Sequence, residues 1–423
     1  MPCLYGGMPC PCHKILPLTM TAVHLGLKEN AAQFSLLVLI NAFVGGMVGL
    51  ERSILPSLAE QVYGLNANLA VLSFIAVFGL FKAATNYLTG ALAQRFGRKN
   101  LLIIGWIIAL PIAPLLIYAQ NWNWILFANA LLGIQQGLTW SSTVVMKIEL
   151  VGPKQRGLAM GINESAGYLA VGGMAFLSGW LASEFGLVPY PFLMGMILSI
   201  LGLLLSWLFV HDTRPFALAE AENSSIPMLP NIAAQTTYKH PNLASISQAG
   251  LVNNLNDGMI WGLLPVLLLQ KGFSLNQMAL LAAIYPAVWG LGQLFTGALA
   301  DVFSKKKLLF WGMLIQGLSI PFLLLFDSFQ GLAFPLAALG LGTAVVYPTF
   351  LAGISENTHP SQRPKAIGTF RFWRDLGYVF GALLSGWLAD QWSIPIAVVS
   401  VGALTLASGL WLGFRMKNRL VSS

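Results

Sequence analysis

Eight ionisable side chains interrupt stretches of sequence that are otherwise long and apolar. They are four carboxylates and four bases: Glu51, Arg52, Lys82, Glu164, Asp257, Arg371, Arg374 and Asp375. An ionisable group is costly in an apolar medium and usually faces a polar interior, so each one is a candidate for binding a substrate or a proton. The competing interpretation is that these groups form structural salt bridges that fix helix packing.

Three of these residues fall on one predicted helix, 366–389. Arg371 and Asp375 are four residues apart and share a helix face. Arg371 and Arg374 are three residues apart, so two guanidinium groups could converge on one anionic group, a geometry that arginine suits. Asp375 could instead neutralise one of the two. For this trio the structural and the functional interpretation both stay open.

The best candidate for a coupling proton is Asp257. It follows Asn253, Asn254 and Asn256, and amides at this density suggest a wetted polar face. A carboxylate whose proton affinity is raised by burial could bind and release a proton. The alternative is that the asparagines only hydrogen-bond between helices.

The other candidates are spread along the predicted helices. Lys82 falls near the middle of its helix, where substrate or proton contact is expected. Glu51 and Glu164 fall towards opposite ends of theirs. Glu51 and Arg52 are adjacent and point about 100° apart on a helix, so they need separate partners. Gln136 is a further candidate for lining a polar pathway.

The elements that position these residues are predicted to be twelve membrane-spanning helices. The 423 residues are 56% hydrophobic and only 9% charged, whereas soluble domains carry roughly a quarter charged residues. Apolar runs of about 20 residues cross a bilayer as helices. The runs are 34–57, 69–93, 101–120, 124–145, 157–182, 191–210, 245–269, 278–300, 308–326, 332–351, 366–389 and 394–414.

The predicted organisation is two six-helix halves joined by a polar linker. A tail (1–33) precedes the N-terminal half (34–210), and a linker (211–244) precedes the C-terminal half (245–414) and a final tail (415–423).

The placement of basic residues predicts the orientation in the membrane. Of the 23 Lys and Arg residues, 18 fall in tails and loops on one side, with Lys147 counted among them, and Lys271 is alone on the other. Cytoplasmic loops carry such an excess, so both termini are expected in the cytoplasm. This bias also accounts for the net charge of +8, so nucleic acid is not an expected partner.

The two halves repeat each other at a constant offset of 207 residues. Thr89–Ala93 recurs as Thr296–Ala300, and Ser178–Ala182 recurs as Ser385–Ala389. The ionisable residues do not follow the repeat, because Glu164 aligns with Arg371 and Lys82 aligns with Trp289. A shared offset of this extent indicates duplication of one six-helix unit.

Two loops carry a resemblance to a known family. One runs Gly90-Ala-Leu-Ala-Gln-Arg95-Phe-Gly97-Arg98, and the other runs Gly297-Ala-Leu-Ala-Asp301-Val-Phe-Ser-Lys305. Both resemble the loop signature of the major facilitator superfamily. Gln94 stands where the family usually has an acid, and Ser304 where a glycine is usual. Helix 157–182 has the glycines of the antiporter signature but no proline after Gly167, and no arginine stands near Gly133.

The resemblance implies an all-α fold of twelve helices in two pseudo-symmetric halves. It also implies a secondary transporter with alternating access, driven by protons, in which the two loops form a gate. The glycines of helix 157–182 favour efflux of a small solute. The alternative is uptake or exchange of an anionic metabolite, favoured by Lys82, Arg371 and Arg374, or a transporter-like receptor that does not transport.

Several expected absences complete the interpretation. No nucleotide-binding loop, metal-ligand pair or nucleophile motif is present, so neither an enzyme nor a cofactor is expected. The expected partners are a small-molecule substrate, protons and lipid, with the chain as a monomer in a bacterial-type cytoplasmic (inner) membrane. All three cysteines, Cys3, Cys10 and Cys12, precede His13; a soft-metal site is conceivable there, but a tail without metal, or a start at Met20, is favoured.

Overall fold

The computed structural model describes residues 24–52, 54–65, 68–222 and 224–417, and within them the chain is helical without strands. The N-terminal half contains α1 (Ala31–Arg52), α3 (Asn68–Phe96), α4 (Arg98–Ala109) continued by α5 (Ile112–Ile117), α6 (Trp122–Val151), α7 (Arg156–Phe185) and α8 (Tyr190–Leu208). The C-terminal half contains α11 (Pro241–Gln270), α12 (Leu275–Val302), α13 (Lys305–Phe322), α14 (Phe329–Glu356), α15 (Arg363–Gln391) and α16 (Ile394–Arg415). Each predicted apolar run coincides with one of these helices, which confirms the fold class. The cysteine-rich tail lies outside the described residues.

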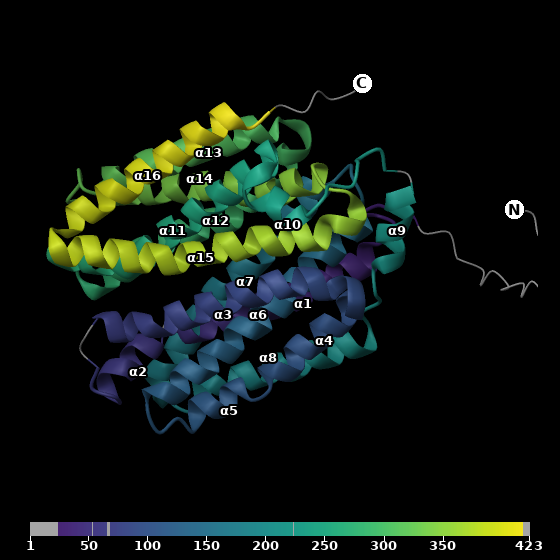
Figure 1. The fold of residues 1–423 in the computed structure, drawn as a ribbon. Helices are drawn as coiled ribbons and strands as arrows, with labels where there is room; N and C mark the ends of the chain where they lie inside the picture. Colours follow the sequence, from purple (N-terminus) through teal and green to yellow (C-terminus); the bar gives the residue numbers. More distant parts are fainter. Residues whose placement is uncertain (1–23, 53, 66–67, 223, 418–423) are drawn as a thin grey trace, which may run out of the picture.

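Short helices connect the long ones. The helix α2 (Leu55–Gln61) follows α1, and the linker between the halves contains α9 (Arg214–Glu222), α10 (Ile232–Ala234) and one turn of π-helix, Gln235–Lys239. In Figure 1 the N-terminal half lies below the C-terminal half, with α9 at the right-hand end, and α10 packs on α15 of the C-terminal half.

Polar side chains start several of the long helices. Asn121, Ser274, Ser328 and Ser393 each accept a hydrogen bond from a backbone N–H in the first turn of α6, α12, α14 and α16. Such caps satisfy N–H groups that have no partner inside the helix. All four caps lie at one end of the bundle, because these helices run in the same direction.

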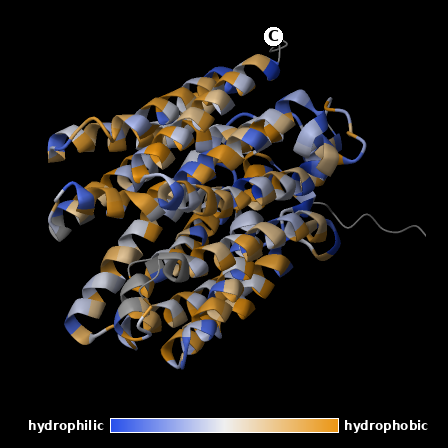
Figure 2. Cartoon of the chain, turned by 60° about the vertical axis from the view of Figure 1, so that its left-hand side comes forward, coloured by the Kyte–Doolittle hydropathy of each residue, from blue (hydrophilic) through white to orange (hydrophobic). Residues whose placement is uncertain are grey.

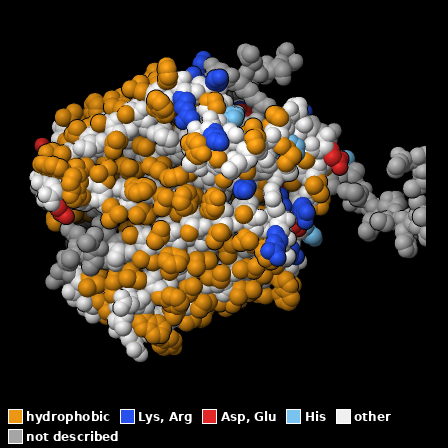
Figure 3. All heavy atoms as spheres, viewed as in Figure 1, with side chains coloured by type: hydrophobic (Ala, Val, Ile, Leu, Met, Phe, Trp, Pro, Cys, Tyr) orange, Lys and Arg blue, Asp and Glu red, His pale blue; other side chains and the backbone are white. Residues whose placement is uncertain are grey.

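The outer surface of the bundle is apolar. Phe176, Trp207, Phe295 and Phe414 are among many large hydrophobic side chains that are more than half exposed. Figure 2 shows hydrophobic residues along the length of the helices, and Figure 3 shows them as a broad belt. An exposed apolar belt of this extent is matched by lipid rather than by water.

Eight of the helical spans in the described residues are long and apolar enough to cross a membrane by length and composition. The four long helices outside that set are α6, α11, α13 and α15. The first, second and fourth of these carry many buried polar side chains, including Lys147, Asp257 and Arg371. Their lower hydropathy therefore reflects the polar centre that they build.

Lysine and arginine gather at one end of the molecule. We call this the basic end: it is where α1 and α11 begin and where α3 and α12 finish, and Figure 3 shows it at the right. Lys147 corrects the sequence-based count. It was expected in a loop, but α6 continues six residues past Val145 to Val151 and buries Lys147 completely.

The halves contact each other most closely near the basic end. There α3 packs on α15, and α7 packs on α12. A Cβ atom on Gly161 would lie 2.3 Å from the carbonyl oxygen of Gln293, and one on Gly90 would lie 2.6 Å from that of Pro364. Gly90 also approaches Gly368, and Gly161 approaches Gly297, so both crossings use repeat-related glycines. Small residues let helix backbones approach this closely.

Candidate substrate and proton site

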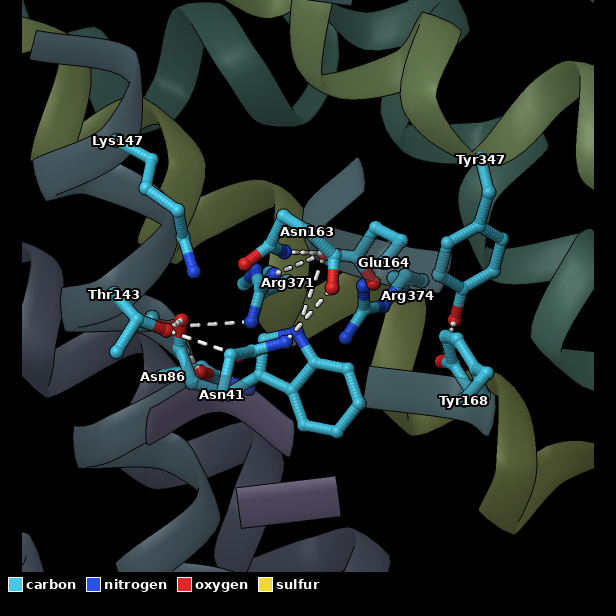
Figure 4. A network of polar contacts seen from close by, with 12 residues as sticks. Asn41, Asn86, Thr143, Lys147, Asn163, Glu164, Tyr168, Tyr347, Arg371 and Arg374 are labelled. Carbon is cyan, nitrogen blue, oxygen red and sulfur yellow. Dashed lines mark hydrogen bonds and ion pairs between the residues drawn. The ribbon is translucent and has the colours of Figure 1, made fainter. Parts of the chain in front are cut away.

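Glu164 and Arg371 meet across the interface between the halves. Glu164 lies on α7 and Arg371 on α15, each two turns in from the basic end, and both are fully buried. The distance from Arg371 Nη2 to Glu164 Oε1 is 3.5 Å. The same oxygen accepts shorter hydrogen bonds from Asn163 Nδ2 at 2.7 Å and from Trp140 Nε1 at 3.2 Å (Figure 4). The repeat-related acid and base are therefore direct neighbours.

Asp375 pairs with Arg374 and also bridges the halves. Its Oδ1 lies 2.6 Å from Arg374 Nη2, and its Oδ2 accepts a hydrogen bond from Asn86 on α3. Asn254 on α11 donates to Oδ1 at 3.4 Å. The two guanidinium groups of α15 therefore have different carboxylate partners, one in each half. We call Lys147, Glu164, Arg371, Arg374 and Asp375 the central ionic cluster.

Asp257 lies within the C-terminal half, fully buried on α11. The hydroxyl of Tyr285 on α12 donates to Asp257 Oδ1 and lies 3.3 Å from the hydroxyl of Thr343 on α14. This carboxylate thus has a phenol at hydrogen-bond distance.

The adjacent asparagines connect helices. Asn253 donates to Asn254 at 3.3 Å, and Tyr347 on α14 donates to the same Asn254 oxygen at 3.3 Å. Both amides are fully buried. Asn254 therefore links α11 to α14 and, through Asp375, to α15.

An aromatic layer crosses the interface next to the ionic cluster, on the side away from the basic end. Tyr168 of α7 donates to Tyr347 of α14 at 2.8 Å. The ring of Tyr168 lies 3.9 Å from that of Trp289, which stacks on Tyr285 at 5.7 Å. These rings separate the ionic cluster from the opposite end of the bundle.

Three further predicted site residues lie in the N-terminal half. Lys82 is buried, with its ammonium 5.2 Å from the ring centre of Phe78 and 5.3 Å from that of Trp140. Glu51 lines a small cavity with Phe74, Phe78 and Asn129. Gln136 donates to the carbonyl of Val44 at 2.7 Å and so joins α6 to α1. Arg52 ends α1, and its side chain is outside the described part of the structure.

The two signature loops, 90–98 and 297–305, differ for a reason that the structure makes clear. Asp301 accepts hydrogen bonds from the backbone N–H groups of Gly157 at 2.7 Å and Leu158 at 2.9 Å, at the N-terminus of α7. A carboxylate is favoured at that position of a helix. In the other copy Gly157 is replaced by Pro364, which has no N–H. There Gln94 instead donates to the carbonyl of Ser361 at 2.8 Å.

The basic residues of the two signature loops form two repeat-related ion pairs. Arg98 contacts Glu149 at 2.7 Å, and Lys305 contacts Glu356 at 2.5 Å. The first pair is buried, whereas the second is partly exposed. Gly97 takes a positive φ of 81° where α3 turns into α4, and Arg95 is exposed and stacks on Phe96 at 5.5 Å.

The linker ties both halves together at the basic end. Glu220 of α9 binds Arg156 of the N-terminal half, and it binds Arg363 of the C-terminal half at 2.9 and 3.0 Å. The two arginines are repeat-related. Burial raises the pKa of Glu220, but hydrogen bonds and charges from Arg363 and Arg156 outweigh it and lower the pKa to about 2. Glu220 is therefore ionised at physiological pH.

Sequence reasoning missed Lys147, Glu149 and Glu220 as structured residues. The first two follow a predicted span directly, and a charged residue after an apolar run is usually a loop residue. The repeat could have predicted the ion pair of Glu149, since Glu149 aligns with Glu356 and Arg98 aligns with Lys305. No such signal was available for Lys147, which aligns with Ile354, or for the linker.

Two pseudo-symmetric six-helix bundles, a lipid-type outer surface and a polar centre between the halves define a membrane transporter. The family model of the Major Facilitator Superfamily matches residues 28–245 and again 246–421. The chain therefore belongs to the major facilitator superfamily.

Known relatives share this fold at low identity. The inner membrane transport protein YnfM of Escherichia coli (strain K12) is 28% identical over 148 residues, which cover 35% of this chain and 36% of YnfM. The multidrug resistance protein MdtG of Salmonella dublin is 23% identical over 89% of this chain and 93% of its own length. The human organic anion transporter MFSD10 (TETRAN) superposes with a TM-score of 0.73 at 16% identity, over 90% of this chain and 98% of that one.

Proposed function

We propose that the chain is a secondary active transporter that moves a small organic solute by alternating access between its two halves. The observation that carries the proposal is the central ionic cluster, which draws buried charges from both halves. Charges at this depth are expensive unless they are functional or paired. Glu220, the two glycine crossings and the Asp301 contact with α7 join the halves on the basic-end side of the cluster, so this conformation is closed at the basic end.

We further propose that protons drive transport and that Asp257 carries them. Its carboxylate is fully buried and has the hydroxyl of Tyr285 as a donor. A carboxylate in such surroundings can exchange a proton when the halves open. The Tyr285 that donates to it belongs to the same C-terminal half.

The proposed direction is efflux, with the basic end in the cytoplasm of a bacterial-type inner membrane. The positive-inside rule supports the orientation, and the multidrug resistance protein MdtG supports export. The proposed protein works as a monomer without a cofactor and catalyses no reaction. Uptake or exchange of an anionic metabolite is the alternative, because bases outnumber acids in the central ionic cluster. A transporter-like receptor is the other alternative.

The substitution Asp257→Asn tests the coupling. It keeps the shape of the side chain but removes proton exchange, so proton-driven flux should fall to background while substrate counterflow in proteoliposomes continues. A screen of toxic compounds in cells with and without the protein supplies the substrate for both assays. Asp390→Asn, an exposed acid on α15, is the matched control and should change neither flux.

Two results would overturn parts of the proposal. If Asp257→Asn leaves proton-driven flux intact, the proton site is elsewhere. If the wild-type protein shows no counterflow with any compound of the screen, the receptor alternative holds and the transporter proposal is wrong.

A further inference from the structure

Lys147 is a buried cation that the proposed mechanism does not use. It lies on α6 with no exposed surface, and its ammonium donates to the carbonyl oxygen of Leu37 at 2.9 Å. An ammonium has three donors, and among the described residues this is the one hydrogen bond that it makes. Figure 4 shows its tip directed towards Arg371, and its charge interacts with Glu164 and Arg371.

Arg371 is also short of partners. Its contacts with Ser141 Oγ and Glu164 Oε1 are both 3.5 Å long, and its buried Nε has no hydrogen-bond partner. Arginine normally uses its five donors in a fork that fits a carboxylate with two short bonds. Glu164 accepts its shorter hydrogen bonds from Asn163 and Trp140, so Arg371 keeps most of its donor capacity.

The central ionic cluster has three bases and two carboxylates, so it carries one surplus positive charge when Lys147 is protonated. Lys147, Arg371 and Arg374 are its cations, and Glu164 and Asp375 are its carboxylates, and all five side chains are buried. Asp375 pairs closely with Arg374, so the excess falls on Lys147 and Arg371. An uncompensated buried charge destabilises the structure unless it serves a ligand.

We propose that Lys147 and Arg371 together form the site for a monoanionic head group, a carboxylate in type, of the transported solute. The inference rests on the proposed transport function and assigns its substrate class. Arg371 presents the planar fork, and Lys147 supplies a point charge from the neighbouring helix of the other half. One surplus positive charge matches a monoanion better than a doubly charged phosphate ester.

The position of the site fits an alternating-access cycle. It lies between the aromatic layer on one side and the glycine crossings and Glu220 on the other. Lys147 belongs to the N-terminal half and Arg371 to the C-terminal half, so separation of the halves parts the two cations. An anion bound to both side chains would therefore favour the conformation in which the two halves are closed around this site.

Thermal unfolding of the purified full chain with matched compounds tests the inference. The compounds come in triplets with the same apolar body and a carboxylate, an amide or an amine as head group, such as benzoate, benzamide and benzylamine. Triplets with a phenyl, a phenylbutyl and a steroid body cover three sizes. Phenyl phosphate is added as a doubly charged anion. A ligand that binds the folded state raises the unfolding midpoint. We expect at least one carboxylate to raise it, and its amide, its amine and the phosphate ester to leave it unchanged.

Two variants separate binding from structure. Lys147→Met and the double variant Glu164→Gln/Arg371→Gln remove the cations without leaving an unpaired carboxylate, so both should fold. Each should weaken carboxylate binding by about tenfold or more, while the exposed control Lys154→Met should bind as the wild type does. If Lys147 only anchors α6 to α1, Lys147→Met lowers the ligand-free midpoint and keeps the carboxylate effect, which overturns the proposal.

Failure of this inference can be told apart from failure of the transport proposal. If no carboxylate raises the midpoint, or if amides or amines raise it instead, the anion site is wrong. Counterflow of those neutral or cationic compounds would then still support a transporter. If carboxylates bind and never undergo counterflow, the anion site stands and transport fails.

Discussion

At the scale of single residues, burial decides how much each ion pair contributes to the stability of the folded protein. The pairs Arg98–Glu149 and Lys305–Glu356 occupy repeat-related positions, but the side chains of the first are 4% and 0% exposed and those of the second 16% and 33%. Removing one partner of a buried pair leaves a charge without compensation, whereas an exposed partner is solvated by water. Loss of one partner therefore costs more stability in the buried pair than in the repeat-related exposed pair.

The variants Arg98→Met and Lys305→Met should differ accordingly. We expect the first to lower the free energy of unfolding by about 3 kcal/mol or more and the second by about 1 kcal/mol or less. Urea-induced unfolding of each purified variant, followed by tryptophan fluorescence, measures both. Equal losses in the two variants would show that burial does not distinguish these pairs.

At the scale of helices, hydropathy predicts most of the architecture. A bilayer requires an apolar run of about 20 residues, so each long helix corresponds to such a run in the sequence. Apart from the end of α6, the predicted boundaries lie within a few residues of the observed ones. The predicted end of α6 was wrong because neighbouring helices bury Lys147 and Glu149. A hydropathy profile contains no information about such contacts.

The candidate site was predictable only in part, for the same reason. Residue type and periodicity pointed to Glu164, Arg371, Arg374 and Asp375, but which carboxylate meets which base depends on how the helices are rotated. The aromatic layer, and the contacts of Glu220 with both halves, join residues that are far apart in the sequence. No local sequence pattern could therefore predict them.

The glycine crossings give a prediction at this scale. Gly161→Ala should lower the unfolding midpoint and the transport rate, because its Cβ would lie 2.3 Å from the Gln293 carbonyl and force α7 and α12 apart. Gly172→Ala on the same helix is the control, since nothing lies within 4 Å of a Cβ there. Alanine favours a helix over glycine by about 1 kcal/mol, so the control should be neutral or slightly more stable. A stabilised Gly161→Ala protein would contradict the close crossing.

At the scale of the whole molecule, the linker acts as a clasp between the halves. Glu220 has a pKa lowered to about 2, against roughly 4.3 for an unperturbed glutamate. A carboxylate with a lowered pKa contributes stability above its unfolded value and loses it as the pH falls through the folded value. The Glu220 carboxylate is thus charged at physiological pH, so it is not a candidate for the proposed proton site.

The unfolding midpoints of the wild type and Glu220→Gln should therefore differ by a constant amount from pH 8 to about pH 5. The difference should shrink as the pH falls from about 4.3 towards 2, where the wild-type carboxylate becomes protonated. Scanning fluorimetry in detergent over this range makes the measurement. A difference that disappears between pH 8 and pH 5 would mean that Glu220 titrates in the physiological range.

The central claim is that the two halves rock about the buried ionic cluster, with the basic end closed in the conformation described here. Spin-label distances test it most directly, using a chain whose three tail cysteines are replaced by serine. One pair of labels at Asn100 and Lys307 spans the basic end, and another at Asn123 and Gln330 spans the opposite end; all four positions are exposed, and the members of each pair are repeat-related. Adding Asp301→Asn and Glu220→Gln weakens the charged contacts between the halves at the basic end. The account predicts that the first distance lengthens while the second shortens; two distances that stay fixed, or that change in the same direction, would contradict it.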